Sequence, residues 1–250
     1  MMNRGNGAET HESAALRMLG AASDADRAHH WSAAAEGYRA TIAEAALSSE
    51  RGVVADAQRH LATVLNRIGN STEARSACHE SLALSESLGD RARTAEALNT
   101  LGCLYLESGE LAEAEDAFTR ATRLGPANPA LQGELEHHLG TVARLRGDDA
   151  AARARFRRAL IAFTAARDDR GRAAAFQSLG AVSAHQEQWA DADRYQRRGL
   201  EVARSIANGN GHDHRAPPGD AVSRRPFEPQ RAESLVTRVV IEAADGAHGS

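Results

Sequence analysis

Apolar and small residues recur along the chain in a pattern that repeats about every forty positions. Four segments spaced about forty residues apart each carry a leucine followed by alanine or glycine, with an alanine thirteen residues after the leucine. These marker pairs are Leu61 with Ala74, Leu101 with Ala114, Leu139 with Ala152 and Leu179 with Ala192. The alanines are 40, 38 and 40 residues apart, and a weaker fifth copy places Ala34 another 40 residues upstream. A fixed period of this length predicts a stack of repeated supersecondary units.

Turn signals divide each copy into two helical stretches. Three of the turns, at residues 68–70, 108–110 and 146–148, are centred on a glycine that can end a helix in the left-handed conformation, and the fourth falls at 187–189. Between copies, the segments 49–52, 89–92 and 168–171 each carry an acidic residue suited to starting a helix. The third copy is followed instead by two prolines, Pro126 and Pro129, which enforce a break.

Small residues inside the helices indicate how the helices pack. A glycine follows three of the marker leucines, at positions 102, 140 and 180. Glycine inside a helix costs about 1 kcal/mol relative to alanine, so close approach of the second helix through the marker alanines is expected to offset it. The large aromatic residues, which stand at helical spacing, are expected in the core: Trp31, Tyr38, Phe118, Phe156 and Trp189. One pair cannot bury its own apolar face, so the copies must stack.

The third copy is the clearest of the five. It reads Leu98, Leu101-Gly102, Tyr105, Ala114, Phe118 and Pro126 at intervals that resemble the tetratricopeptide repeat, with Leu98 where that family usually has tryptophan. The near-40 spacing is similar to the longer repeats of kinesin light chains and bacterial signal-transduction regulators. The resemblance covers roughly residues 13–206. It implies an all-α, right-handed superhelical solenoid of about five antiparallel helix pairs.

In this family the first helices of successive pairs line a concave groove, and the resemblance implies the same here. Residues two positions before each marker leucine then form a ladder of hydrogen-bonding side chains: Arg59, Asn99, His137 and Gln177. Thr63 and Cys103, two positions after their leucines, belong to a narrow floor. Arg67 and Arg144 are expected to pair with acidic side chains of a bound segment. The alternative is that these are ordinary solvated residues on the inner face of a solenoid.

Composition removes several other functions. Every one of the 30 Lys and Arg residues is arginine, so the chain has neither the lysine of a Walker A loop nor one for Schiff-base chemistry. Acidic and basic residues are mixed along the chain and sum to a net charge of -4, so the chain offers no broad basic face for nucleic acid. The 11 histidines match no metal-binding motif, and we expect neither a metal nor a cofactor. Two cysteines and the lack of long apolar runs predict a cytoplasmic protein with no membrane span.

These observations together predict a protein-interaction module, a bacterial regulatory or assembly protein that binds a peptide or partner segment in its groove. Two alternatives use the same groove: an enzyme with Cys103 as nucleophile near His137, and a nucleic-acid-binding solenoid. Residues 1–12 are predicted to be a flexible N-terminus and residues 207–250 a largely disordered tail. A short apolar segment near 234–243 in this tail either caps the last pair or occupies the groove. The identity of the partner and the oligomeric state stay open.

Overall fold

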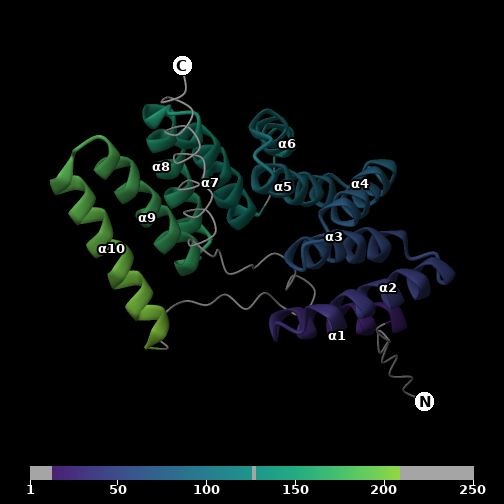
Figure 1. Ribbon diagram of the computed structural model, residues 1–250. Helices are drawn as coiled ribbons and strands as arrows, with labels where there is room; N and C mark the ends of the chain where they lie inside the picture. The colour runs from purple at the N-terminus through teal and green to yellow at the C-terminus, as the bar shows by residue number, and fades with distance from the viewer. Residues whose placement is uncertain (1–12, 126–127, 209–250) are drawn as a thin grey trace, which may run out of the picture. The chain divides into compact units, whose positions relative to one another are not determined.

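The computed structural model describes residues 13–125 and 128–208, and within these ranges all regular structure is α-helical (Figure 1). The helices are α1 (Ala14–Arg27), α2 (Trp31–Leu47), α3 (Arg51–Arg67), α4 (Ser71–Ser87), α5 (Arg91–Glu107), α6 (Leu111–Arg123), α7 (Pro129–Leu145), α8 (Asp149–Ala165), α9 (Asp169–His185) and α10 (Trp189–Ala207). The predicted all-α fold of five helix pairs is therefore confirmed. The weakest copy in the sequence forms a complete pair, α1 and α2.

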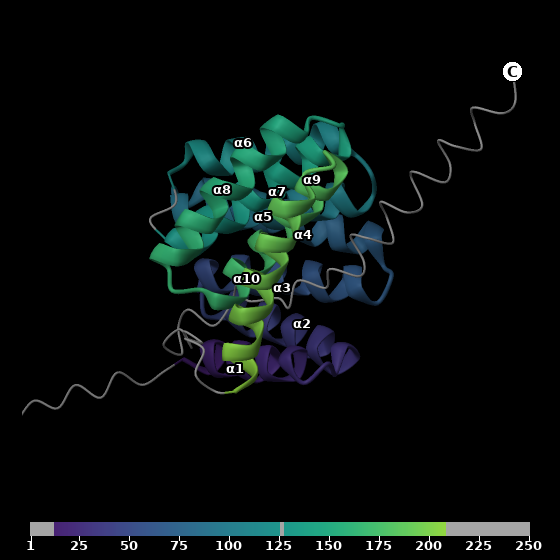
Figure 2. The same cartoon turned by 90° about the vertical axis from the view of Figure 1, so that its left-hand side faces the viewer.

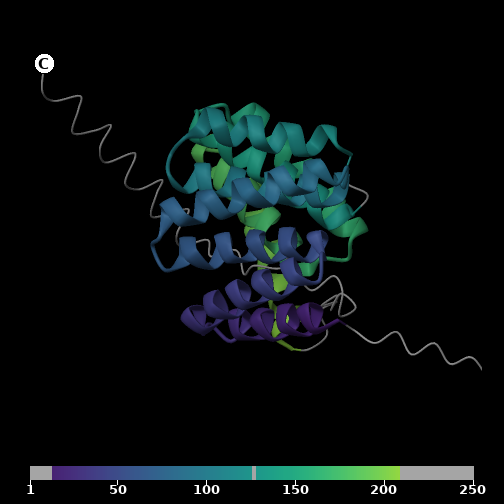
Figure 3. The same cartoon turned by 90° about the vertical axis from the view of Figure 1, so that its right-hand side faces the viewer.

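The chain divides into two compact units, one ending at Leu88 and the other beginning at Gly89. In the first unit α1 packs on α2, α3 packs on α4, and α2 joins the two pairs by contacting α3 (Figure 3, purple to blue helices). In the second unit the pairs are α5–α6, α7–α8 and α9–α10, and each second helix that precedes another pair also contacts the first helix of that pair. Helices α9 and α10 lie side by side in two views (Figures 1 and 2).

Left-handed residues end the first helix of four pairs where the sequence predicted turns. Gly69, Gly109 and Gly147 have φ values of +87°, +78° and +79°. In the first of these turns the amide of Asn70 donates to the carbonyl of Leu65 at 2.9 Å, the long hydrogen bond of a Schellman motif. The fourth turn has no glycine, and Glu187 takes the left-handed conformation there with φ of 58°. The turns are therefore the same in geometry although one differs in residue type.

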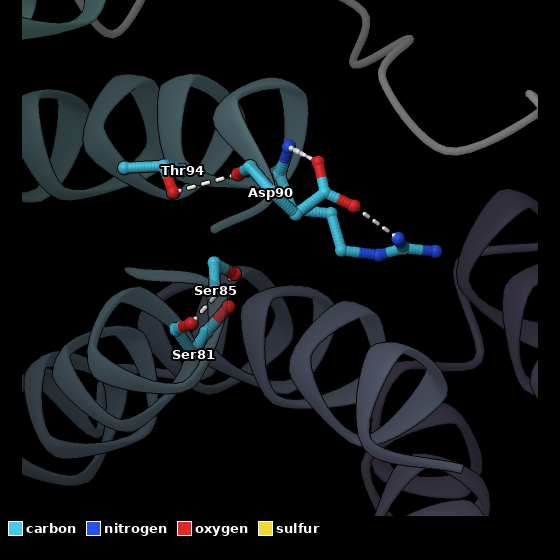
Figure 4. Close-up of polar contacts among 5 residues, drawn as sticks. Ser81, Ser85, Asp90 and Thr94 are labelled. Carbon is cyan, nitrogen blue, oxygen red and sulfur yellow. Dashed lines mark hydrogen bonds and ion pairs between the residues drawn. The ribbon is translucent and has the colours of Figure 1, made fainter. Parts of the chain in front are cut away.

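Side-chain caps begin several helices, although not every predicted one. The Asp90 carboxylate accepts the amide hydrogen of Arg93 and also pairs with its guanidinium at 2.5 Å, while Thr94 Oγ1 donates to the Asp90 carbonyl (Figure 4). Asp168 likewise accepts from the amide of Gly171. Glu50, in the segment 49–52, makes no capping hydrogen bond, because its carboxylate accepts the hydroxyl hydrogen of Ser13 instead. Glu50 does precede α3 as predicted, but the prediction that its side chain caps the helix was wrong.

Serine replaces apolar residues at one buried contact between the helices of a pair. Ser81 on α4 donates to the carbonyl of Ala55 on α3 at 2.7 Å. One turn further along α4, Ser85 Oγ donates to the Ser81 carbonyl at 2.8 Å, and both serines are buried (Figure 4). Each hydroxyl thus has an acceptor inside the core, which removes the cost of burying it.

The marker glycines make room for aromatic rings and not only for the marker alanines. A Cβ atom at Gly102 would lie 2.5 Å from Phe118 Cε1, and one at Gly140 would lie 2.7 Å from Phe156 Cε1. Phe118 and Phe156 stand four residues after their marker alanines, which are themselves fully buried. In the last pair Gln196 takes the place of the ring, and a Cβ atom at Gly180 would meet Gln196 Cγ at 3.4 Å, an ordinary contact.

The core of the second unit contains a ring that the sequence did not single out. Phe163 on α8 is 3% exposed and lies between two glycines, Gly133 on α7 and Gly171 on α9. A Cβ atom at either glycine would come within 2.6 Å of the ring. The expected core aromatics Tyr38, Phe118 and Phe156 are buried as predicted, and Trp31 is partly buried. Trp189, however, is 66% exposed, so its assignment to the core was wrong.

Among the described residues, the first helix begins at Ala14 and the last helix ends at Ala207. Pro126, residues 1–12 and most of the predicted tail, with its apolar segment near 234–243, lie outside the described residues.

Candidate partner-binding face

Arg59 and Thr63, two predicted groove residues of α3, are buried. Arg59 is 5% exposed, and its guanidinium lies 3.2 Å from His60 Nε2. Thr63 Oγ1 donates to the Arg59 carbonyl one turn earlier. The His60 ring in turn stacks on Tyr38 with 5.4 Å between ring centres. Both predicted residues therefore belong to the packed interior of the first unit.

Arg67, the third predicted residue on α3, is engaged in an ion pair. Its guanidinium Nη1 donates to Asp26 Oδ1 at 2.7 Å, and both side chains are mostly buried. The pair joins the end of α3 to the end of α1 within the first unit. Arg67 would reach an acidic partner only by leaving this carboxylate.

A polar seam joins the first helices of the second unit at the predicted ladder. Asn99 on α5 donates to Glu134 on α7 at 3.0 Å. Further along these helices, Cys103 Sγ lies 3.5 Å from Nε2 of a histidine on α7, and this histidine is His138 rather than His137. His137 instead faces the last pair, where its Nε2 lies 2.9 Å from Ser178 Oγ on α9. The expected proximity of Cys103 to His137 is therefore replaced by contact with the adjacent residue.

The surroundings of His137 keep its imidazole neutral. The side chain is 3% exposed, and its ring lies against Phe156 with 5.1 Å between ring centres. Burial lowers the pKa of His137 to about 4, with a backbone hydrogen bond at Ala174 opposing the shift and the positive charge of Arg144 contributing to it. At neutral pH His137 is thus an uncharged member of the core.

Tyr38 shows the same effect of burial in the first unit. Loss of solvent raises the pKa of the Tyr38 hydroxyl to about 12, although a hydrogen bond to Ser23 opposes this shift. The phenol therefore stays protonated and serves as a buried donor.

An open stripe remains on the first helices of the second unit. On α5 the half-buried residues Glu96, Asn99 and Cys103 stand three or four positions apart, so they share one side of the helix. On α7 the half-buried residues Glu134 and Arg144 continue this side. We call these five residues the inner stripe. It combines two carboxylates, an amide, a thiol and a guanidinium, and it corresponds to the face on which the sequence predicted partner contacts.

Gln177, the last ladder residue, is exposed, whereas His137 at the equivalent position 40 residues earlier is buried. The difference has a simple cause within the described residues, because α9 covers His137 and no helix follows α10 to cover Gln177. The ladder residues therefore lie where one helix pair contacts the next. A ladder residue is buried where the following pair covers it and exposed where no described helix follows.

Sequence reasoning missed His138 and Ser178, which make the contacts between neighbouring first helices. Both stand one residue before a marker leucine, so a ladder drawn at that position would have found them. It also missed Glu136, a buried carboxylate on α7 that pairs with Arg155 and Arg158 on α8 at 3.1 and 3.0 Å. No local motif marks this residue.

In the part of the chain that the structure describes, His, Cys, Asp and Glu side chains form no group of three that could hold a metal ion. Among the described helices, none combines the length and the apolar character needed to cross a membrane.

Family models support the repeat directly. Two models described as tetratricopeptide repeat match the chain, one over residues 53–127 and the other over residues 172–216. The first spans α3 to α6 and the second spans α9 and α10. The chain is a tetratricopeptide repeat protein, as its marker residues predicted. Among curated proteins none matches it by sequence.

Solved structures share the fold at low sequence identity. BtubC (BKLC) from P. vanneervenii gives a TM-score of 0.60 at 20% identity and covers 86% of this chain and 96% of that one. TPR-like repeats of a Podosopora anserina kinesin light chain give 0.58 at 15% identity, covering 79% and 100%. A Rap protein complexed with competence and sporulation factor gives 0.69 at 12% identity, covering 78% of this chain and 56% of that one. The likeness to kinesin light chain repeats agrees with the 40-residue spacing.

Proposed function

We propose that the chain is a non-enzymatic interaction module that holds a peptide segment of a partner protein against the inner stripe. The stripe itself carries the proposal: five polar side chains on one side of α5 and α7 stay half-exposed beside closely packed neighbours. Helix pairs with such an open side are suited to binding an extended or helical segment. A cytoplasmic regulatory or assembly role in a bacterium fits this activity.

Proteins of the same fold supply further support. The Rap protein was solved with competence and sporulation factor, and the Cut9 protein was solved in a hetero-tetramer with Hcn1. Both proteins therefore hold another molecule while sharing the fold of this chain. The shared fold at 12% and 20% identity says nothing about which partner this chain binds.

The chemistry of the stripe suggests which contacts a partner makes. Asn99 and the carboxylates Glu96 and Glu134 suit the backbone amides and basic side chains of a peptide. Arg144 supplies the positive charge among the five stripe residues, and it would pair with an acidic side chain. Arg59, Thr63 and His137 are buried, so in this proposal they position the helices and do not touch the partner directly.

A random-peptide display on the full chain, followed by affinity measurements on the selected peptides, tests the proposal. Replacing Asn99→Ala together with Glu96→Gln should weaken binding at least roughly tenfold, because two polar contacts at about 1 kcal/mol or more each are lost. The matched control is Arg157→Ala with Glu113→Gln, since these two side chains are exposed on the second helices α8 and α6. Equal affinity of the stripe variant and the wild type would place the binding site elsewhere.

The enzyme alternative rests on the contact between Cys103 and His138. A hydrolytic or transfer activity that Cys103→Ser abolishes, with peptide affinity unchanged, would favour it over the binding proposal.

A further inference from the structure

One surface of α10, the last described helix, differs from the equivalent surface of α8, the second helix of the preceding pair. In the second unit, residues of α8 that face the next pair are covered by α9. The positions 40 residues later lie on α10, and we call them the α10 end face: Trp189, Gln196, Leu200 and Ala203, in register with Asp149, Phe156, Leu160 and Phe163. The comparison between these two sets shows what a following helix would cover.

Helix α9 covers the α8 set along its whole length. At its C-terminal end, His185 Nδ1 lies 2.6 Å from Asp149 Oδ2, and the Asp149 side chain is only 13% exposed. In the middle, Leu179 and Val182 of α9 form one core cluster with Phe156. Near its N-terminus, Gly171 lies against the Phe163 ring. The first helix of the last pair, α9, thus runs antiparallel across α8, the second helix of the pair before.

The α10 end face has no such cover among the described residues. Trp189 is 66% exposed and Leu200 is 55% exposed, whereas Asp149 and Leu160 at the equivalent positions are largely covered. Gln196 and Ala203 are exposed, whereas Phe156 and Phe163 are buried. Large apolar side chains exposed at the end of a repeat stack are unfavourable, and repeat proteins ordinarily cover them.

The chain after α10 contains a segment whose apolar residues stand at the same spacing as five packed residues of α9. On α9 the residues Ala175, Leu179, Val182 and Ser183 are buried, and the partly buried Ser178 contacts His137. The same spacing recurs at Ala232, Leu235, Val236, Val239 and Val240. On a helix these five tail residues would share one side. The tail therefore carries the side-chain pattern of one more first helix.

The intervening chain is long enough for this segment to return. Residues 209–231 separate it from the last described residue, and at about 3.3 Å per residue they span up to roughly 75 Å. Helix α10 has 19 residues and is about 28 Å long at 1.5 Å per residue. A tether of this length holds the segment at an effective concentration near the millimolar range, so even weak docking would be occupied.

We propose that residues 232–243 dock as an amphipathic helix on the α10 end face and take the place that the first helix of a sixth pair would occupy. The contact closes the apolar end of the stack with the chain's own tail. It would also cover Gln177, as α9 covers His137. The inner stripe on α5 and α7 lies outside this contact.

Fluorescence of Trp189 in the full-length chain tests the docking directly. Replacing Trp31→Phe leaves Trp189 as the single tryptophan, and acrylamide quenching then reports its exposure. Val239→Asp with Val240→Asp places two charges on the apolar side of the segment, and we expect roughly twofold stronger quenching as the tethered helix leaves. Thr237→Asp with Ile241→Asp adds the same charge on the opposite side and should leave the quenching unchanged.

Rescue in trans separates docking from an indirect effect. A synthetic peptide of residues 230–245, added at millimolar concentration to the Val239→Asp, Val240→Asp chain, should restore the protection of Trp189. Equal quenching in wild type and both variants would overturn the proposal, as would failure of the peptide to restore protection. Protection that appears only at high protein concentration, together with a dimer in sedimentation, would identify a second copy as the occupant and would also overturn it.

Discussion

Replacing Gly102 with alanine inserts one methyl group where the structure has no room for it. The new Cβ atom would lie 2.5, 2.7 and 2.8 Å from Cε1, Cδ1 and Cζ of Phe118, well inside ordinary contact distance. Phe118 is fully buried, and its ring stacks on His138 with 5.0 Å between ring centres, so it cannot move aside without disturbing α7. Overpacking of this kind costs about 1–3 kcal/mol, partly offset by about 1 kcal/mol from the better helix propensity of alanine. We expect a net loss of stability of up to about 2 kcal/mol.

Gly180 provides a matched control with the opposite expected sign. It occupies the equivalent position on α9, yet its Cβ atom would meet only the flexible Gln196 side chain at 3.4 Å, with Ala192 O and Tyr195 Cβ further away. Gly180→Ala should therefore keep most of the propensity gain and stabilise the second unit by up to about 1 kcal/mol. The two substitutions are chemically identical and gain the same helix propensity, so their difference of about 1–3 kcal/mol measures the cost of overpacking against the aromatic ring.

Urea unfolding of both variants, followed by circular dichroism at about 222 nm, measures the difference. A Gly102→Ala, Phe118→Leu double variant should be more stable than the sum of its single changes predicts, since the smaller side chain makes room for the methyl group. Equal shifts at Gly102 and Gly180, or simple additivity in the double variant, would refute the idea that the ring requires the glycine.

Three further changes test other parts of the structure. The pKa of His137 is about 4 in the fold and near 6.5 in the unfolded chain. The contribution of His137 to the free energy of unfolding should therefore be fully present above pH 6.5 and should be lost as pH drops towards 4. This loss, up to about 3 kcal/mol, should be absent in His137→Phe when unfolding is measured across this range. Phe163→Ala should cost roughly 3–5 kcal/mol in urea unfolding, because nothing else fills the space between Gly133 and Gly171. Asp90→Ala should cost about 1 kcal/mol in thermal unfolding through the lost cap, whereas Asp90→Asn should keep most of it.

The sequence predicted those features that depend on local chemistry and spacing. Left-handed turns followed from glycine at positions 69, 109 and 147, since few other residues adopt positive φ without cost. The cap at Asp90 followed from an acidic residue just before a helical pattern. The marker leucines and alanines are buried because a constant period places them on the same side of each helix.

Features that depend on the third dimension could not be read in the same way. The repeat aligns Asn99 with His137, 38 residues later, but it does not reveal that α9 buries His137 while Asn99 stays half-exposed. Adjacent residues on a helix point about 100° apart, so the choice between His137 and His138 as the neighbour of Cys103 needed the packing of α5 against α7. Trp189 was assigned to the core by its spacing, yet its cover depends on whatever follows α10.

Solvent access of Cys103 gives the most direct measure of whether a partner occupies the inner stripe. Cys103 is half-buried on the stripe and Cys78 is fully buried, so a thiol reagent should modify only the former in the native chain. A bound peptide should slow alkylation of Cys103 at least severalfold while leaving an exposed cysteine introduced by Arg157→Cys on α8 as reactive as before. If a tightly bound peptide protected the cysteine at position 157 and left Cys103 unprotected, the inner stripe would not be the binding surface.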